Sequence, residues 1–290
     1  MYKAINILFY IFLSTSIVAC TESLEDIPGS NENVHGFDVI WRSNVTDKQK
    51  EAIREIFTDM QYVEGGTFLM GATQEQAHYA RENEKPAHYV QLSDYYIGKS
   101  EISIQQLEYL LNKEFSAFER NHGAPQYTWT DWKNVIDLIY EYSGVRVDFP
   151  TEAQWEYAAR GGNESNGFIY SGGNTLEKAE TCENELGLLG MARGHSEWCK
   201  DAFNEYSGLP LEINPYYVQG LGHVIRGGNE KAVEELKDYF DTRFSSKNKF
   251  SNVYKDVRNC RVSARSYGDV SHAYLGIYIS CRLVINIKQK

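Results

Sequence analysis

The fold of this 290-residue chain is most clearly indicated by residues 149–162, which read FPTEAQWEYAARGG. Thr151 and Gln154 have the spacing of a capping box and predict that a helix begins there. The glycines at 161 and 162 predict its end, because glycine adopts the left-handed backbone conformation that follows many helices. The segment is therefore predicted to be a short helix of the core.

This helix carries side chains suited to packing. Trp155 and Tyr157 provide an aromatic face, and Glu156 stands four residues before Arg160, a spacing that favours an ion pair. A general acid–base pair is one interpretation of Glu152 and Glu156. A solvated helical face is the interpretation that we favour, so the helix is predicted to be scaffold.

The flanking sequence alternates short strands with a few well-marked helices. Helical periodicity and capping pairs predict helices at 46–60, 103–111, 132–143 and 230–240. Gly65 and Gly66 lie between apolar residues at 62–63 and 67–70 and predict a hairpin. Further strands are predicted at 89–92, 261–264 and 274–284, with mostly loops beyond residue 163. Early helices and late strands are typical of an α+β domain.

The first twenty residues predict an exported lipoprotein. Lys3 supplies a positive charge, residues 7–18 are mostly apolar, and small or apolar residues precede Cys20. The apolar run is too short to span a bilayer core of about 30 Å comfortably, as expected of a signal peptide. The segment resembles a bacterial lipobox, which implies that Cys20 is acylated and that residues 1–19 are removed. A buried strand or an uncleaved membrane anchor is the alternative.

Residues 20–35 are predicted to form a flexible acidic tether between the lipid and the folded body. They mix Ser, Glu, Asp, Asn, Pro and Gly and show no apolar period. Glu22, Glu25 and Asp26 resemble a surface-export signal of lipoproteins. We therefore expect membrane lipid to hold the protein through Cys20 at the outer membrane, on its periplasmic or its surface face.

The charge of the chain limits its partners. The formal net charge is −11, and Lys and Arg form no cluster. This argues against nucleic acid and against electrostatic binding to a membrane surface.

Besides Cys20, the chain contains Cys182, Cys199, Cys260 and Cys281. An even number in an oxidising compartment favours disulfides, although the sequence leaves three pairings open.

Several segments together suggest a family. In chain order they are 62–71, 84–90, 96–101, 149–162, 184–188, 197–199, 226–228 and 260–265. This ordered set resembles the formylglycine-generating enzyme, or sulfatase-modifying factor, family over about residues 60–285. The resemblance implies one irregular α+β domain of the C-type-lectin-like kind at 61–288, after an N-terminal helical extension at 36–60. On physical grounds we expect Arg265 and Arg282 to fix loops through forked hydrogen bonds. The residues to which we assign a scaffold role are Trp155, Glu156, Arg160, Trp198, Arg226, Arg265 and Arg282.

Family members that oxidise a substrate cysteine use two cysteines just after an Arg-Gly-Gly turn, because thiolates suit copper(I) and sulfur chemistry. This chain has the turn at 226–228 but no cysteine between Gly228 and Asn259. We therefore predict no catalytic residue and no cofactor, and favour a non-catalytic domain that binds an unknown protein or glycan, with 163–174 and 205–219 as candidate contact segments. A divergent formylglycine-generating oxidase is one alternative, and a structural subunit of a surface or secretion complex is another.

The resemblance also gives a weak calcium candidate and a disulfide. Calcium-binding members carry the motif Gly-Asn-Val/Ala-Trp-Glu-Trp, and this chain keeps its glutamate as Glu197. The corresponding segment offers few other oxygen ligands, whereas calcium requires six to eight. Cys199 and Cys260 both lie in family core segments, and we predict a disulfide between them. Cys182 and Cys281 have a weaker claim to a bridge.

Changing Cys20 to Ala is expected to release the protein from the membrane fraction, because the anchoring acyl chains can no longer be attached. Cell fractionation followed by immunoblotting measures the release. Ser23→Ala in the tether is the matched control and should leave the protein with the membrane. A mass spectrum of the mature protein that contains Lys3 and no lipid would contradict the prediction.

Overall fold

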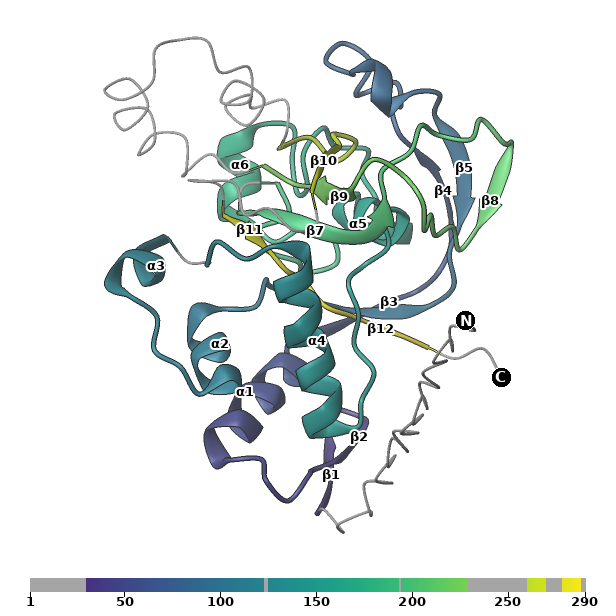
Figure 1. Ribbon diagram of the computed structural model, residues 1–290. Helices are drawn as coiled ribbons and strands as arrows, with labels where there is room; N and C mark the ends of the chain where they lie inside the picture. The colour runs from purple at the N-terminus through teal and green to yellow at the C-terminus, as the bar shows by residue number, and fades with distance from the viewer. Residues whose placement is uncertain (1–29, 123–124, 193, 229–259, 270–277, 288–290) are drawn as a thin grey trace, which may run out of the picture.

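A computed structural model describes residues 30–122, 125–192, 194–228, 260–269 and 278–287 of the chain (Figure 1). Its helices are α1 Asp47–Thr58, α2 Ile104–Leu111, α3 Ala117–His122, α4 Trp129–Ser143, α5 Glu152–Ala159 and α6 Leu176–Thr181. Short 3-10 turns lie at Glu82–Glu84 and Gly162–Glu164. Complete capping boxes begin α1, α2, α4 and α5, and those at Thr46, Ser103 and Thr151 confirm the predicted helix starts.

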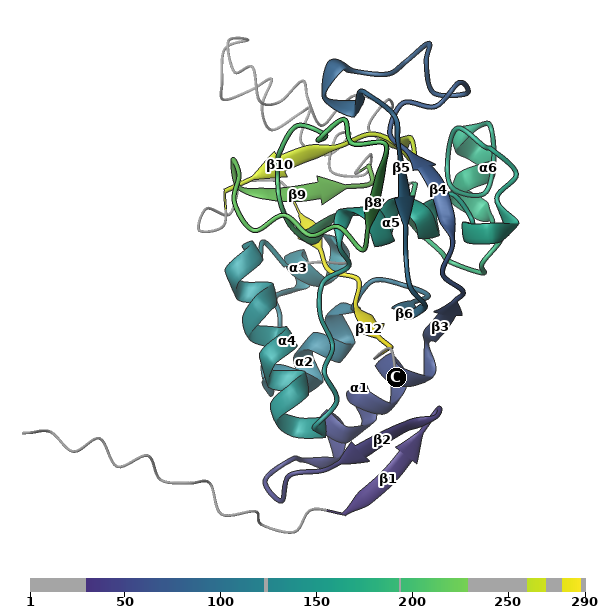
Figure 2. The ribbon, with the colours of Figure 1, turned by 90° about the vertical axis from the view of Figure 1, so that its right-hand side faces the viewer.

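The strands of the described residues form small sheets. They are β1 Asn31–Val34, β2 Phe37–Ile40, β3 Met60–Val63, β4 Thr67–Met70, β5 His88–Gln91, β6 Tyr95–Gly98, β7 Ser196–Ala202, β8 Leu211–Ile213, β9 His223–Arg226, β10 Ser266–Gly268, β11 Ile279–Ser280 and β12 Val284–Asn286. β1 and β2 form a hairpin, and the other sheets have the strand orders β10-β9-β7-β11, β12-β6-β3 and β4-β5-β8. Figure 2 shows β8 at the front, beside β5 and β4.

The core has two parts. At the lower end of Figure 1, α1, α2 and α4 pack together with the β1–β2 hairpin, and Ile53, Leu107 and Ile139 are fully buried there. The second part surrounds α5, where Trp155 and Tyr157 pack among residues of β4, β5, β6, β7 and β9. Every residue of α5 is buried, so this helix lies at the centre of the upper half.

The N-terminal region differs from the prediction. β1 begins at Asn31, so the tether predicted for 20–35 extends too far, and Val34 is already buried. Helix α1 is confirmed, but its apolar face belongs to the same core cluster as α4, which makes residues 36–60 an integral part of the fold. Cys20 lies outside the described residues. Within those residues, no helix is both long and apolar enough to cross a bilayer.

The predicted hairpin around Gly65 and Gly66 is wrong. β3 pairs with β6, whereas β4 pairs with β5 in a different sheet. A side chain on Gly65 would place its Cβ 2.3 Å from the carbonyl oxygen of Leu92, and Leu92 donates its N–H to the carbonyl of Gly66. The glycine is therefore required for close packing against the β5–β6 connection and not for a two-residue turn.

The later predictions are confirmed only in part. The segment beyond residue 163 contains α6, β7, β8 and β9, which the sequence did not indicate. Residue 261 forms an isolated bridge to Tyr170, and the strand predicted at 261–264 is replaced by β10 further on. The run predicted as one strand at 274–284 contains β11 and the start of β12. The helix predicted at 230–240 lies outside the described residues.

Ile53→Ala tests whether α1 belongs to the cooperative core. Because Ile53 is fully buried, truncating it should lower the free energy of unfolding of the whole domain by about 2–5 kcal/mol. Urea unfolding followed by tryptophan fluorescence measures the loss. The exposed Glu51 on the same helix provides the control Glu51→Ala, expected within about 0.5 kcal/mol. A separate early transition in Ile53→Ala would show that α1 is an independent extension.

Candidate functional site

A network of buried carboxylates and guanidinium groups lies beneath the turn at 226–228. Arg226 on β9 donates from Nε to Glu152 Oε1 at 3.0 Å and from Nη2 to Glu156. Arg265 donates to both oxygens of Glu152, at 2.7 and 2.5 Å. Arg160 donates from Nε to Glu156 Oε1 at 2.9 Å. The two carboxylates of α5 thus face three arginines in the interior, which corrects the prediction that they form a solvated helical face.

The remaining donors of these arginines hold loops. Nη1 of Arg226 bonds the carbonyl oxygens of Val262 and Ala264 at 3.0 and 2.9 Å. Nη1 of Arg265 reaches the carbonyl of Asn83 at 3.2 Å, and Nη2 of Arg160 reaches that of Gly71 at 2.8 Å. Each arginine therefore joins a carboxylate of α5 to a loop, as the predicted scaffold role requires.

A second buried ion pair joins Glu197 of β7 to Arg282. Nη2 of Arg282 donates to Glu197 Oε1 at 2.8 Å, and Trp155 Nε1 donates to Oε2 at 2.8 Å. Arg282 also bonds the carbonyl oxygens of Gly98, Lys99 and Leu189 at 2.7–2.8 Å. The forked hydrogen bonds predicted for Arg265 and Arg282 are therefore present.

The calcium candidate Glu197 does not fit a calcium site. Its oxygens already accept hydrogen bonds from Arg282 and Trp155, and a guanidinium at this distance repels a cation. Among the residues that the structure describes, no three His, Cys, Asp or Glu side chains are arranged to hold a metal ion. Burial raises the pKa of Glu197, and the attraction of Arg282 opposes the rise.

The predicted Cys199–Cys260 disulfide is not formed in the structure. Cys199 is a free cysteine buried in the core cluster around α5. Cys260 packs instead against the turn, where a Cβ on Gly228 would lie 2.2 Å from its sulfur. Burial raises the pKa of the Cys199 and Cys281 thiols well above the usual range, so both are protonated and poor nucleophiles.

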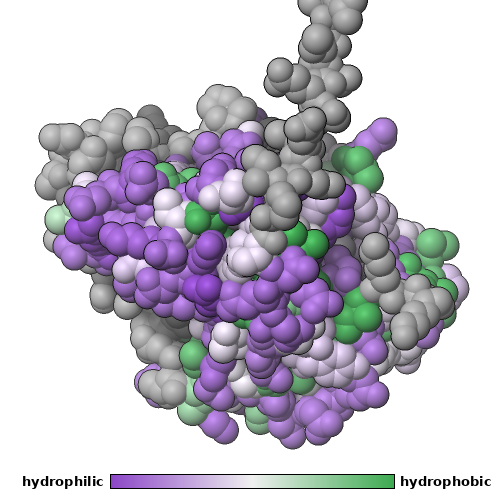
Figure 3. Space-filling model, turned by 90° about the horizontal axis from the view of Figure 1, so that it is seen from below, coloured by the Kyte–Doolittle hydropathy of each residue, from purple (hydrophilic) through white to green (hydrophobic). Residues whose placement is uncertain are grey.

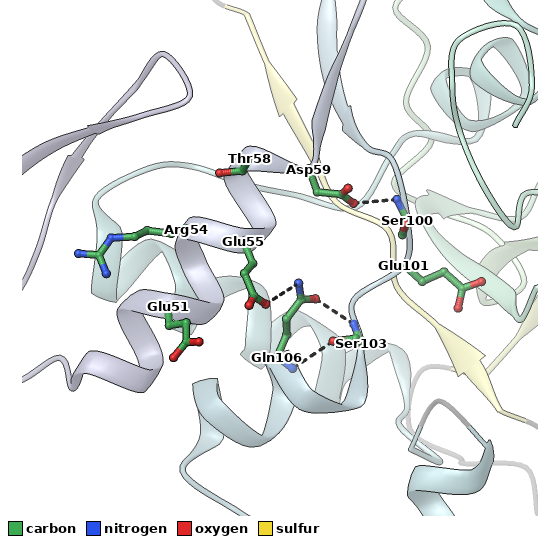
Figure 4. A pocket seen from close by; sticks show the side chains of 9 residues that line it. All are labelled: Glu51, Arg54, Glu55, Thr58, Asp59, Ser100, Glu101, Ser103 and Gln106. Carbon is green, nitrogen blue, oxygen red and sulfur yellow. Dashed lines mark hydrogen bonds between the residues drawn. The ribbon is translucent and has the colours of Figure 1, made fainter.

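A surface pocket of about 610 Å³ lies between α1 and the start of α2 (Figure 4). Four carboxylates and one guanidinium are among its lining groups, which are Glu51, Arg54, Glu55, Thr58, Asp59, Ser100, Glu101, Ser103 and Gln106. Several of these groups bond one another: Asp59 accepts the Ser100 N–H at 3.0 Å, and Ser103 and Gln106 form the capping box of α2. The pocket is therefore mainly a structural junction.

Glu101 at the margin of this pocket pairs with His195. Its Oε1 accepts the His195 N–H at 2.9 Å, and its Oε2 lies 2.8 Å from Nδ1 of the ring. Burial would raise the pKa of Glu101, but the hydrogen bonds and charge of His195 outweigh burial and the pKa is lowered. Figure 4 shows the Glu101 side chain turned away from the other lining groups.

The outer face of the sheet β4-β5-β8 exposes apolar side chains. The strand registers place Leu69, Tyr89 and Leu211 in one row across the three strands. Tyr89 and Leu211 are 54% and 45% exposed, and Ile213, two residues further along β8, is 66% exposed. Leu209, Tyr216, Val218 and Leu221 of the same segment are exposed as well. Concentrated apolar exposure of this kind marks interaction surfaces.

This apolar face was only partly foreseen. It includes β8, which lies within 205–219, one of the two segments predicted as contact surface, whereas Tyr89 and Leu69 were not singled out. Alternation of apolar and polar residues at 211–214 was the available signal for a strand. Its partner β5 precedes it by more than a hundred residues, and local sequence cannot indicate such pairing.

Comparison with known proteins agrees with this architecture. Residues 45–183 match the family model described as sulfatase-modifying factor enzyme 1-like domain. PvdO from Pseudomonas aeruginosa is similar in structure with a TM-score of 0.56 and 15% identity, over 90% of this chain and 99% of that one. Treponema denticola variable protein 1 has a TM-score of 0.52 and 15% identity, over 88% and 98%. These similarities confirm the predicted irregular α+β fold.

Curated relatives share only part of their length with the chain. The serine/threonine-protein kinase pkn1 of Chlamydia caviae is 25% identical over 237 residues, which are 67% of this chain and 37% of that protein. The chaperone protein LppX of Paenibacillus barcinonensis is 28% identical over 209 residues, which are 49% and 70% respectively. The chain thus spans well under half of the kinase that it matches.

Arg282→Met tests the buried ion pair. Removing the guanidinium leaves the carboxylate of Glu197 buried without a cation and should lower the free energy of unfolding by about 3–5 kcal/mol. Urea unfolding measures this loss. Arg54→Met is the matched control, because its pair with Glu32 lies at the surface and is expected to contribute less than about 1 kcal/mol. Equal losses in the two variants would contradict a structural role specific to the buried pair.

Proposed function

We propose that this chain, which contains a sulfatase-modifying factor enzyme 1-like domain, is a lipid-anchored protein of the cell envelope that binds a partner without catalysing a reaction. The observation that carries the proposal is the missing thiol pair: no cysteine occurs between Gly228 and Asn259, where oxidising members of the family have two. Copper(I) and sulfur chemistry at this place would lack both its metal ligands and its nucleophile.

The described interior supports a binding role. In the interior, Glu152, Glu156 and Glu197 face arginines that also hold loops. The fully buried thiols of Cys199 and Cys281 are kept protonated. These groups stabilise the fold, and their charges are already neutralised by one another. Glu101, whose pKa is lowered, lines the open pocket beside α1, but its carboxylate is held by His195.

We assign the binding role to the exposed apolar face of β4-β5-β8. Apolar side chains on three neighbouring strands offer a surface whose burial by a partner is favourable. The similarity to a protein named a chaperone supports a partner that is itself a polypeptide. The anchor through Cys20 would place this surface at the cell envelope.

The purified chain is expected not to convert the cysteine of a sulfatase-motif peptide to formylglycine, with or without copper, because it lacks the thiol pair. Mass spectrometry of the peptide detects the mass loss that accompanies aldehyde formation. A formylglycine-generating enzyme that has both cysteines serves as the positive control, and the heat-inactivated chain as the blank. Copper-dependent turnover above that blank would refute the non-catalytic proposal and favour a divergent oxidase.

A further inference from the structure

We propose that the free edge of β8 binds an extended, uncharged segment of a partner polypeptide, which adds to the sheet β4-β5-β8 as a further strand. The inference deepens the proposed function and rests on it. It concerns the backbone of residues 211–213 and the apolar side chains around them. An exposed strand edge is a template for such pairing, with main-chain hydrogen bonds giving affinity and alternate side chains giving specificity.

The backbone groups on the outer side of β8 are available. β8 is the terminal strand of its sheet and pairs with β5 on one side. Asn214 donates its N–H to the carbonyl of Gln91 at 2.8 Å. Because backbone groups alternate in direction along a strand, those of Leu211 and Ile213 point away from β5. Within the described residues, no hydrogen bond joins this outer side to another segment.

Hydrogen bonds of the Asn214 and Glu212 side chains hold β8 in a fixed conformation. The side chain of Asn214 accepts the Ser93 N–H at 2.8 Å and donates to the Ser93 hydroxyl at 3.0 Å. The Glu212 carboxylate is buried, and it accepts hydrogen bonds from Tyr217 at 2.6 Å and from Ser207. A strand that is ordered before binding loses little conformational entropy when a partner strand is added.

The chemistry around the edge selects an uncharged segment. Between Gly208 and Gly222 the only charged residue is Glu212, and its side chain is buried. Ile213 extends a row that contains Gln91 and Thr67, beside the apolar row of Leu211. The face is therefore a neutral, largely apolar area on a chain whose formal net charge is −11. Alternate apolar side chains of an added strand would continue both rows.

A second copy of the chain fits this edge poorly. If two β8 strands paired in antiparallel fashion through their outward groups, Leu211 of each would lie opposite Ile213 of the other. Glu212 would then lie opposite Glu212, and like charges directly opposite one another in a sheet are destabilising. The symmetric pairing that uses both outward residues is thus disfavoured, whereas an uncharged partner strand meets no such repulsion.

The lipid surface is a poor match as well. Figures 1 and 2 show β1, where the described chain begins, and β8 toward opposite ends of the molecule. Figure 3 shows the end that contains β1 as largely hydrophilic. A tether at 21–30 reaches at most about 35 Å when fully extended. Because Cys20 precedes β1 in the chain, the anchor would attach at the end of the molecule opposite β8.

The test uses the purified full chain and a fluorescent eight-residue peptide of alternating Val and Thr, with fluorescence anisotropy as the readout. We expect saturable binding that weakens at least tenfold when alternate peptide bonds are N-methylated, because methylation removes strand hydrogen bonds. Hydrogen exchange at the amides of Leu211 and Ile213 should slow in the complex. Absence of saturable binding, or equal binding of the methylated peptide, would overturn the inference.

Ile213→Pro is the variant that isolates the backbone. Proline removes the outward N–H and is compatible with an edge strand, so the fold should persist and binding should fall at least tenfold. Ile213→Thr keeps the N–H and is the control, expected within about threefold of the original chain. Ile213→Lys adds a charge to the row at an exposed position, so the fold should be unaffected. Its binding of the peptide should also fall at least tenfold. Unchanged binding by the Pro and Lys variants would refute the proposal.

Two further outcomes would point to another occupant and thereby overturn the inference. Concentration-dependent dimers in analytical ultracentrifugation that disappear in Ile213→Lys would identify a second copy. Binding of the Cys20→Ala chain to neutral phosphatidylcholine vesicles that disappears in the same variant would identify a lipid surface. The formylglycine assay separates this inference from the proposed function: a chain that lacks oxidase activity and does not bind the peptide refutes the strand edge alone.

Discussion

The fold depends on ion pairs that two carboxylates at its centre form with arginines. Helix α5 is buried on all sides, yet it carries Glu152 and Glu156, whose charges would be very costly in the interior without partners. Arg226 contacts both carboxylates, and it also holds the carbonyl oxygens of the segment at 262–264. Because removing one partner would leave a buried charge, the network imposes one arrangement on α5, on β9 and on the late loops together.

The same constraint explains how a fold with small sheets and long loops is stabilised. Loop backbones carry polar groups that regular ladders do not satisfy, and here buried guanidinium groups satisfy several of them. Arg282 bonds three carbonyl oxygens besides Glu197, and it links the β6 end to the segment before β7. Burial raises the pKa of Glu197 against the attraction of Arg282, so the pair contributes through specific geometry more than through net charge stabilisation.

The elements that the sequence predicts correctly are those whose causes are local. Capping boxes at Thr46, Ser103 and Thr151 involve residues three apart, and all three helices begin as predicted. Glu152 was assigned to a solvated face, because its partners Arg226 and Arg265 lie 74 and 113 residues away in the chain. The sequence indicated a scaffold role for those arginines and for Glu156, but not that Glu152 pairs with the arginines. The same limit applies to β8, whose exposed face is defined only by pairing with β5.

The closed network also determines where function can reside. In the described interior, Glu152 and Glu156 of α5 pair with Arg226 of β9, and Glu197 of β7 pairs with Arg282, so altering any of these groups for chemistry would weaken the fold. Surface strands are under no such constraint. A partner strand can bind the free edge of β8 and its exposed apolar side chains without disturbing Glu212. The side chain of Glu212 is buried and contacts Ser207 and Tyr217. A scaffold fixed by buried ion pairs and a separate, uncharged strand edge are therefore compatible within one small domain, and binding at the edge needs no catalytic centre.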